Sequence, residues 1–99
     1  MCLQKMKKYK VVLSKNFRKD LKLAKKRNCN IELLDSIVEK IASGKTLEKK
    51  YKNHLLNGEF KGFYECHVQP DWLLIYKIEK NDLILLLFRT GTHSDLFHD

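Results

Sequence analysis

The stretch that most constrains the fold is "LILLLFR", residues 83–89, in which six apolar residues follow one another before an arginine. A strand with one face in water alternates apolar and polar residues, whereas a continuous apolar run is typical of a strand that is covered on both faces. The run therefore predicts a central strand of a sheet rather than an edge strand.

Three other stretches are predicted to form strands. Residues 9–14, "YKVVLS", are short and rich in β-branched side chains. Residues 62–68, "GFYECHV", and residues 72–78, "WLLIYKI", flank the single proline of the chain, and the intervening Gln69-Pro70-Asp71 predicts a tight turn. A second turn, "EKND", joins residues 72–78 to the apolar run, so the last three strands are expected to follow one another closely.

Two helices are predicted between the first strand and the other three. Ser14 is suited to cap the first helix and Asn30 the second, and Gly44 is suited to end the second. Apolar residues recur at helical spacing in both segments. The buried stripes are expected to be Phe17, Leu21 and Ala24 in the first helix, and Ile31, Leu34, Val38 and Ile41 in the second.

The order of elements is therefore β-α-α-β-β-β in a single α+β domain that spans residues 1–99. The three closely spaced strands predict an antiparallel sheet core, with the two N-terminal helices packed on one face of it. Residues 1–8 are expected to be a flexible lead.

The positive charge of the chain is concentrated in its first 27 residues. These contain eleven Lys and Arg residues and one acid, Asp20, while the formal net charge of the whole chain is +8. Such a segment can simply be a solvated helix face. The imbalance favours the other interpretation, a surface that attracts a polyanion through its phosphates without reading its sequence.

Membrane proteins and disulfide-rich secreted proteins are excluded as classes. No apolar run is long enough to span a bilayer, and the basic start of the chain is not followed by the apolar segment of a secretory signal. The three cysteines, Cys2, Cys29 and Cys66, are widely spaced and odd in number, so they indicate neither a disulfide framework nor a zinc knuckle. A reducing cytoplasm is the expected location.

Polar residues with catalytic chemistry are predicted to lie at strand ends and in loops. His67 ends one strand and Asp71 begins the next, so the two are expected to face each other across the turn within hydrogen-bonding reach. Arg89 ends the apolar strand, where its charge requires an anionic partner. His93 follows four residues later, and His54 lies in the long connection before the hairpin.

Each of these residues also has a purely structural interpretation. A single histidine in a loop, such as His54, is usually just exposed. Arg89 could serve only as the partner of Asp71 in a structural ion pair. Trp72 is more readily a core anchor than a ligand contact, because a large aromatic side chain at a strand start commonly anchors packing. Three histidines, an aspartate and an arginine at the ends of adjacent strands are harder to explain in this way.

Together these residue types suit the cleavage of RNA. The ribose 2′-hydroxyl loses a proton as it attacks the adjacent phosphate, the leaving 5′-oxygen gains one, and the phosphorane needs positive charge. Histidine suits both proton transfers near neutral pH, a guanidinium suits the phosphorane, and an aromatic ring can stack on a splayed base. Asp71 would orient His67. The candidate residues are His54, His67, His93, Arg89 and Phe97.

A metal site is an alternative use of the same residues. It would use the three histidines and Asp71, with Cys66 as a further ligand. No two of the histidines lie at local ligand spacing, so each ligand would come from a different segment. Cys66 and His67 are adjacent in a strand and point to opposite faces. The sequence therefore favours chemistry without a metal or other cofactor.

Two segments carry a resemblance to a known family. The segment "KNHLLNGEFKGFYECHVQPDWLLIYKI" and the later "LFRTGTHSDLF" closely resemble the YafQ branch of the RelE/ParE toxin superfamily. The most specific parts are the His-x-x-Pro-Asp-Trp turn and the Arg-Thr-Gly-x-His-x-x-Leu-Phe ending. The basic first helix and the β-α-α-β-β-β order agree with the RelE-like fold.

The resemblance implies an mRNA interferase toxin of a type II toxin–antitoxin system, which cleaves mRNA in the ribosomal decoding site without a metal and is neutralised by a cognate antitoxin. The expected partners are mRNA, the antitoxin, and ribosomal RNA bound by the basic N-terminal segment. The functional positions implied are His54, His67, Asp71, Trp72, Arg89, His93 and Phe97. The alternative function is a non-catalytic basic module of the same fold that binds nucleic acid or a protein partner.

Overall fold

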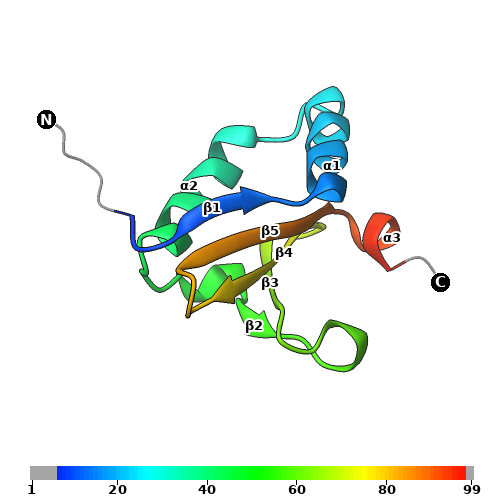
Figure 1. Ribbon diagram of the computed structural model, residues 1–99. Helices are drawn as coiled ribbons and strands as arrows, with labels where there is room; N and C mark the ends of the chain where they lie inside the picture. Colours follow the sequence, from blue (N-terminus) through cyan, green and yellow to red (C-terminus); the bar gives the residue numbers. More distant parts are fainter. Residues whose placement is uncertain (1–6, 98–99) are drawn as a thin grey trace, which may run out of the picture.

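The computed structural model describes residues 7–97, which form a five-stranded sheet with helices packed against it (Figure 1). Residues 1–6 of the expected lead lie outside the described residues. The elements are β1 (Lys10–Leu13), α1 (Lys15–Lys26), α2 (Ile31–Ala42), the 3-10 helix η1 (Lys49–Tyr51), β2 (His54–Leu55), the 3-10 helix η2 (Gly58–Phe60), β3 (Tyr64–Gln69), β4 (Trp72–Glu79), β5 (Ile84–Gly91) and α3 (His93–Leu96).

The strands lie in the order β1-β5-β4-β3-β2. Strand β5, which contains the long apolar run, therefore lies between two neighbours, and the prediction of a central strand is confirmed. Strands β2 to β5 pair antiparallel, as predicted for the sheet core. Strand β1 pairs parallel with β5, with Lys10 opposite Ile84 and Leu13 opposite Leu87, so the complete sheet is mixed.

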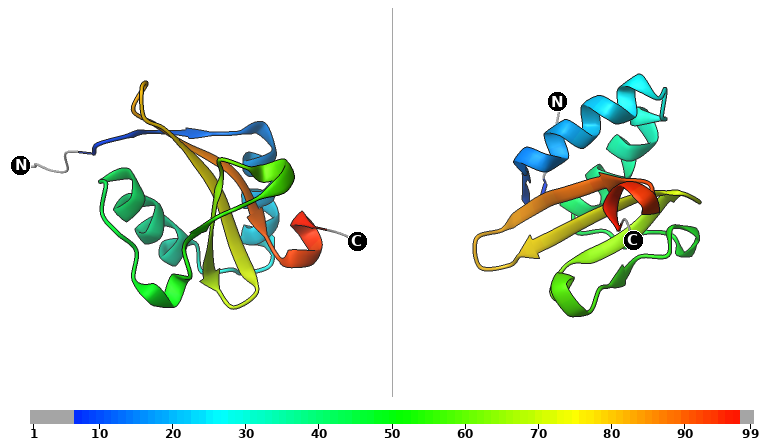
Figure 2. Two further views of the ribbon diagram at one scale, coloured as in Figure 1. Left: turned by 90° about the horizontal axis from the view of Figure 1, so that it is seen from below. Right: turned by 90° about the vertical axis from the view of Figure 1, so that its right-hand side faces the viewer.

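Both long helices cover the same face of the sheet, as predicted (Figure 2). Their buried side chains form one core with the residues of β3, β4 and β5 that point to this face. Three of the largest, Phe17, Leu34 and Ile37, are at most 2% exposed. Ile37 was absent from the predicted stripe, whereas Val38 and Ile31, which were in it, lie at the half-buried edge of the core. At 3.6 residues per turn, position 37 lies between 34 and 41 on the same face.

The predicted helix ends are confirmed. The Ser14 hydroxyl accepts the Phe17 amide at 3.0 Å and donates to the Phe88 carbonyl at 2.6 Å, so the start of α1 is tied to β5. The Asn30 side chain accepts the Leu33 amide at 3.1 Å. Gly44, with a φ of 79°, follows α2 in the left-handed region where glycine carries no steric penalty. Among residues 7–97, no helix is long and apolar enough to span a bilayer.

The other face of the sheet is covered in part by a phenylalanine cluster, Phe60, Phe63, Phe88 and Phe97, whose ring centroids lie 4.7–6.3 Å apart in contacting pairs. Phe60 belongs to η2 and Phe97 follows α3, and neither of these short helices was predicted. η2 has three residues and α3 has four, which is too few to produce a helical period in the sequence. The cluster brings the end of α3 back against the sheet.

Candidate active site

The carboxylate of Asp71 lies in the turn between β3 and β4 and binds His93, the first residue of α3. Its Oδ1 is 3.0 Å from the His93 ring Nδ1 and 3.3 Å from the His93 backbone nitrogen. Hydrogen bonds from the ring and from the backbone amide hold the pKa of Asp71 below its ordinary value, so the carboxylate is ionised at neutral pH. Nδ1 therefore donates to Asp71, and the other ring nitrogen, Nε2, does not take part in this contact.

This contact corrects the prediction that Asp71 pairs with His67 across the turn. Leu73 of β4 lies opposite both His67 of β3 and Gly91 of β5, so His67 is opposite a residue inside the strand. The register between β3 and β4 also shifts between His67 and Gln69. Leu73 pairs with Gly91, so two residues further along each strand Asp71 lies opposite His93. The Asp71 carboxylate therefore binds His93 instead of His67.

A second carboxylate, Glu65, lies between the other two histidines. It is only 7% exposed, and its Oε1 is 3.3 Å from Nε2 of His54 and 3.8 Å from Nε2 of His67. His54 lies opposite Glu65 in the β2–β3 pair, while His67 is two residues further along β3 and so shares its face. The His54 Nδ1 is 2.6 Å from the Lys52 carbonyl, which fixes a hydrogen on that nitrogen.

Sequence reasoning missed Glu65. The sequence does contain a signal for it, because Glu65 and His67 are a charged and an ionisable residue two positions apart in an otherwise apolar strand. Side chains two positions apart lie on the same face of a strand, and a buried carboxylate requires polar partners. The sequence predicts only a connection over residues 45–61, whereas the structure has the short strand β2 there, which delivers the partner His54.

The three histidines and Phe97 form a row of four rings, here called the ring row. Successive ring centroids are 6.5 Å apart from His54 to His67, 6.0 Å from His67 to His93 and 6.5 Å from His93 to Phe97. The rings come from β2, β3 and α3, and Phe97 caps the end of α3. The structure therefore brings together four predicted site residues that are far apart in the sequence.

Arg89 binds a partner from α1. Its Nε and Nη2 lie 2.7 Å and 3.1 Å from the two oxygens of Asp20, which also accepts the Thr90 amide at 3.1 Å. The hydrogen bond to Asp20 raises the pKa of Arg89. The prediction of an anionic partner for Arg89 is confirmed. The alternative pairing of Arg89 with Asp71 is wrong, because α1 packs against β5 and places Asp20 beside the arginine.

Trp72 lies in the core. Its side chain is part of the buried cluster under the helices and only 5% exposed, so the indole ring does not offer a face for a base to stack on. The expectation of a core anchor is confirmed, and the contact with substrate predicted for Trp72 does not agree with its burial. The indole Nε1 is buried and has no hydrogen-bond partner among residues 7–97.

The described residues do not offer a metal site. No group of three His, Cys, Asp or Glu side chains within residues 7–97 is placed to hold a metal ion. Cys66, which was weighed as a ligand, is fully buried in the core on the face opposite His67, and burial raises the pKa of its thiol to about 12.

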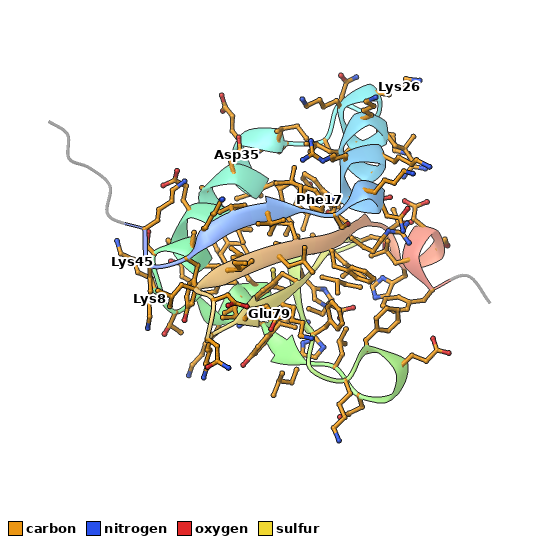
Figure 3. All side chains as sticks on the ribbon, in the orientation of Figure 1. Lys8, Phe17, Lys26, Asp35, Lys45 and Glu79 are labelled. Carbon is orange, nitrogen blue, oxygen red and sulfur yellow. The ribbon has the colours of Figure 1, made fainter. Side chains whose placement is uncertain are left out.

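The exposed side of α1 is strongly basic. Its exposed cations include Lys19, Lys22 and Lys26, and Lys26 lies at the outer end of the helix (Figure 3). Just beyond α1, Arg27 binds Asp95 of α3, with Nη1 2.8 Å from Oδ2. The basic helix is therefore tied directly to the element that carries His93.

Comparison with known proteins gives one consistent family. The model of the family described as "Bacterial toxin of type II toxin-antitoxin system, YafQ" matches residues 9–98. The chain is 41% identical over 85 residues to the mRNA interferase toxin YafQ of Escherichia coli strain K12, which covers 85% of this chain and 90% of that protein.

Two solved structures extend the similarity to the fold. The E. coli DinJ–YafQ toxin–antitoxin complex matches with a TM-score of 0.82 and 38% identity, covering 91% of this chain and 98% of that chain. A metal-bound toxin from Helicobacter pylori matches with a TM-score of 0.86 and 44% identity, covering 90% of this chain and 99% of that chain.

Proposed function

Because the chain belongs to the YafQ family of bacterial type II toxin–antitoxin toxins, we propose that its ring row cuts mRNA in the decoding site of the ribosome. The chain is an mRNA interferase, an endoribonuclease that inhibits translation. The proposed reaction is attack of a ribose 2′-hydroxyl on the adjacent phosphate, which releases the 5′-oxygen of the next nucleotide and leaves a 2′,3′-cyclic phosphate. The observation that carries the proposal is the ring row in which Glu65 lies beside His54 and His67 and Asp71 binds His93.

His93 is proposed as the general acid. Asp71 holds the Nδ1 hydrogen, orients the ring and stabilises its protonated form, so Nε2 can give its proton to the leaving 5′-oxygen. The ring is exposed, with 56% of its side-chain surface accessible, so an RNA strand can reach it.

His54 is proposed as the general base. Its Nδ1 hydrogen is held by the Lys52 carbonyl, so Nε2 is the nitrogen that takes the proton of the 2′-hydroxyl. The carboxylate of Glu65, 3.3 Å from Nε2, would stabilise the positive ring that results. His67 lies between the two and is proposed to face the phosphate.

Arg89 and Phe97 are proposed to contact the substrate. Asp20 fixes two nitrogens of the Arg89 guanidinium, which orients the positive charge proposed to stabilise the phosphorane. Phe97 ends the ring row next to His93, where its ring is proposed to stack on a base beside the cut.

The proposed partners follow from charge and from the family. A toxin–antitoxin complex is known for the E. coli relative, and a cognate antitoxin is proposed here also. The exposed cations of α1 are proposed to bind ribosomal RNA, because phosphates attract such a surface without regard to sequence. Messenger RNA in the decoding site is the proposed substrate, and the cytoplasm is the proposed location.

The test uses purified ribosomes programmed with a defined mRNA in a buffer that contains Mg²⁺, with toxin that either was or was not treated with EDTA and dialysed beforehand. The full chain should cut the message in both conditions, leave a 2′,3′-cyclic phosphate, and fail on a message with a 2′-deoxy sugar at the cut. His93→Ala and His54→Ala should each slow cleavage at least about a hundredfold. Cleavage of the 2′-deoxy message, or unchanged rates in both variants, would contradict the mechanism. Binding without cleavage would instead favour a non-catalytic basic module.

A further inference from the structure

A second hollow opens beside the ring row and is not used by the mechanism above. It has a volume of about 430 Å³ and lies between η1, the end of β3 and the start of α2. His67 lines it, so the hollow is continuous with the middle of the ring row. Ligand pockets in proteins begin at about 300 Å³, so the hollow is large enough for a small organic group.

The walls of this hollow combine an aromatic ring, apolar side chains and two cations. Lys50 and Lys52 are exposed and line it together with Tyr51, whose ring centroid is 5.2 Å from Lys50 Nζ. Lys50 Nζ also lies 3.6 Å from Oε1 of Glu48, an exposed acid that does not line the hollow. Leu33 and Val68 supply apolar surface below. Aromatic rings and apolar surface flanked by cations are the features that hold a base and a phosphate of single-stranded nucleic acid.

The distribution of acids separates this hollow from its neighbour. None of the residues that line it is an Asp or a Glu. A smaller hollow on the other side of the β3–β4 turn, with a volume of about 240 Å³, is lined by three carboxylates, Asp20, Asp71 and Asp95. The guanidinium groups near this smaller hollow are each bound to a carboxylate, Arg89 to Asp20 and Arg27 to Asp95. No acid lines the larger hollow, so its lysines attract a phosphate more strongly.

Lys52 connects the hollow to the ring row through its backbone. It adopts a φ of 50°, in the left-handed region, and ends η1. In this conformation its carbonyl accepts the hydrogen of His54 Nδ1 at 2.6 Å, while its side chain lines the hollow. Occupation of the hollow and orientation of the proposed base therefore depend on the same residue.

We propose that this hollow binds the nucleotide of the mRNA next to the cut, on the side opposite the base held by Phe97. The base lies against Tyr51 and the apolar surface, and a phosphate lies between Lys50 and Lys52. The inference rests on the proposed function, since it assigns a subsite to the same substrate. It predicts that the mRNA runs from Phe97 along the ring row, past His67, and into the hollow.

The decisive experiment couples a change in the protein to a change in the message. Cleavage of ribosome-bound mRNA is measured as kcat/KM for an intact message and for messages with an abasic sugar on either side of the cut. In wild-type protein, both abasic sugars should lower kcat/KM, and the one on the side opposite Phe97 should do so about tenfold or more, as expected for the loss of one stacked base. In Tyr51→Ala the same abasic sugar should have almost no further effect, while Tyr51→Phe should behave as wild type.

For each protein, the kcat/KM of an abasic message is divided by the kcat/KM of the intact message. If only part of the Tyr51→Ala sample is folded, both values fall by the same factor and the ratio does not change. If both abasic sugars lower cleavage as much in Tyr51→Ala as in wild type, the subsite is overturned while cleavage by the wild-type chain leaves the proposed function intact. If wild-type protein does not cut the intact message, the proposed function fails and the subsite fails with it.

The two lysines are tested with a charge-matched control. Lys50→Gln/Lys52→Gln should raise KM about tenfold, leave kcat within about twofold, and weaken the salt dependence of KM. Lys45→Gln/Lys80→Gln removes the same charge from exposed positions that do not line the hollow, and it should leave all three values unchanged. Equal effects of the two pairs would overturn the assigned phosphate contact.

Discussion

Asp71 binds the ring of His93, 22 positions later in the chain, rather than the ring of His67 in its own hairpin. The aspartate thus joins two elements, the β3–β4 turn and the start of α3, at the exposed end of the ring row. The same turn that was expected to form a self-contained pair instead serves the histidine proposed to protonate the leaving group.

Asp71→Asn should slow mRNA cleavage by roughly tenfold to a hundredfold, because a neutral amide neither orients nor stabilises the protonated His93 ring in the same way. The lowered pKa of Asp71 means that the carboxylate remains ionised throughout the pH range in which histidines titrate. The loss should therefore persist at every pH from about 5 to 8. Asp82→Asn, an exposed aspartate in the β4–β5 turn, is the matched control and should cut at the wild-type rate.

Glu65→Gln should slow cleavage by about tenfold or more, because the amide keeps the shape of the side chain but removes the charge beside His54 Nε2. The kcat for cleavage of mRNA on programmed ribosomes is measured, and thermal unfolding checks that the variant is folded. Glu79→Gln removes a partly exposed carboxylate that pairs with Lys77 and should have no effect on kcat. Wild-type kcat in a folded Glu65→Gln protein would remove Glu65 from the site.

Asp20→Ala should lower the free energy of unfolding by about 1–3 kcal/mol, because it leaves the Arg89 guanidinium and the Thr90 amide without their shared acceptor. Urea unfolding at neutral pH measures the change. Asp35→Ala, on the exposed side of α2, should change the value by less than about 0.5 kcal/mol. A similar result for both would mean that the Asp20 contacts add no net stability.

Native alkylation should distinguish the two cysteines of the described residues. With its pKa raised to about 12 and its side chain fully buried, Cys66 has only about one thiolate in ten thousand at pH 8 and should not react until the protein unfolds. Cys29 is half-buried and should react in the folded protein. Mass spectrometry of a Cys2→Ser protein before and after denaturation gives the result, and early labelling of Cys66 would contradict the fold at β3.

Asp95 should make a small contribution to the acid sensitivity of folding. Hydrogen bonds from Arg27 lower the pKa of Asp95 in the folded chain below the ordinary value of 3.8. This stability is present above pH 4 and is lost as the pH falls through the lowered pKa. Asp95→Asn should therefore narrow the difference in unfolding free energy between pH 7 and pH 3 by up to about 1 kcal/mol. An unchanged or wider difference would show that the ion pair does not contribute.

Much of the fold could be predicted because its signals are local. The apolar run of β5 indicated a strand with two neighbours, and Ser14, Asn30 and Gly44 marked helix ends through hydrogen bonds or backbone conformations that span only a few residues. The parallel pairing of β1 could not be predicted. An edge strand has the same side-chain pattern whichever way its partner runs, so direction depends on where α1 and α2 return the chain.

The composition of the site was easier to predict than its pairings. Histidines at strand ends suggested a shared site, but Asp71 met His93 because of how β4 and β5 are aligned, and the partner of Arg89 came from 69 positions away. The spacing of residues within one segment does not indicate which distant residue each side chain will contact. Glu65 was missed for a related reason, since its partner His54 reaches it only through a strand two residues long.

The placement of β5 between β1 and β4 has a consequence for how the protein is made. Among the described residues, β5 follows all the other strands in the chain, and the Ser14 hydroxyl binds the Phe88 carbonyl, 74 positions later. A nascent chain that lacks β5 has neither a closed core nor the α3 segment that carries His93. The chain therefore acquires the ring row only after β5 and α3 have been synthesised, and a shorter nascent chain lacks the proposed site.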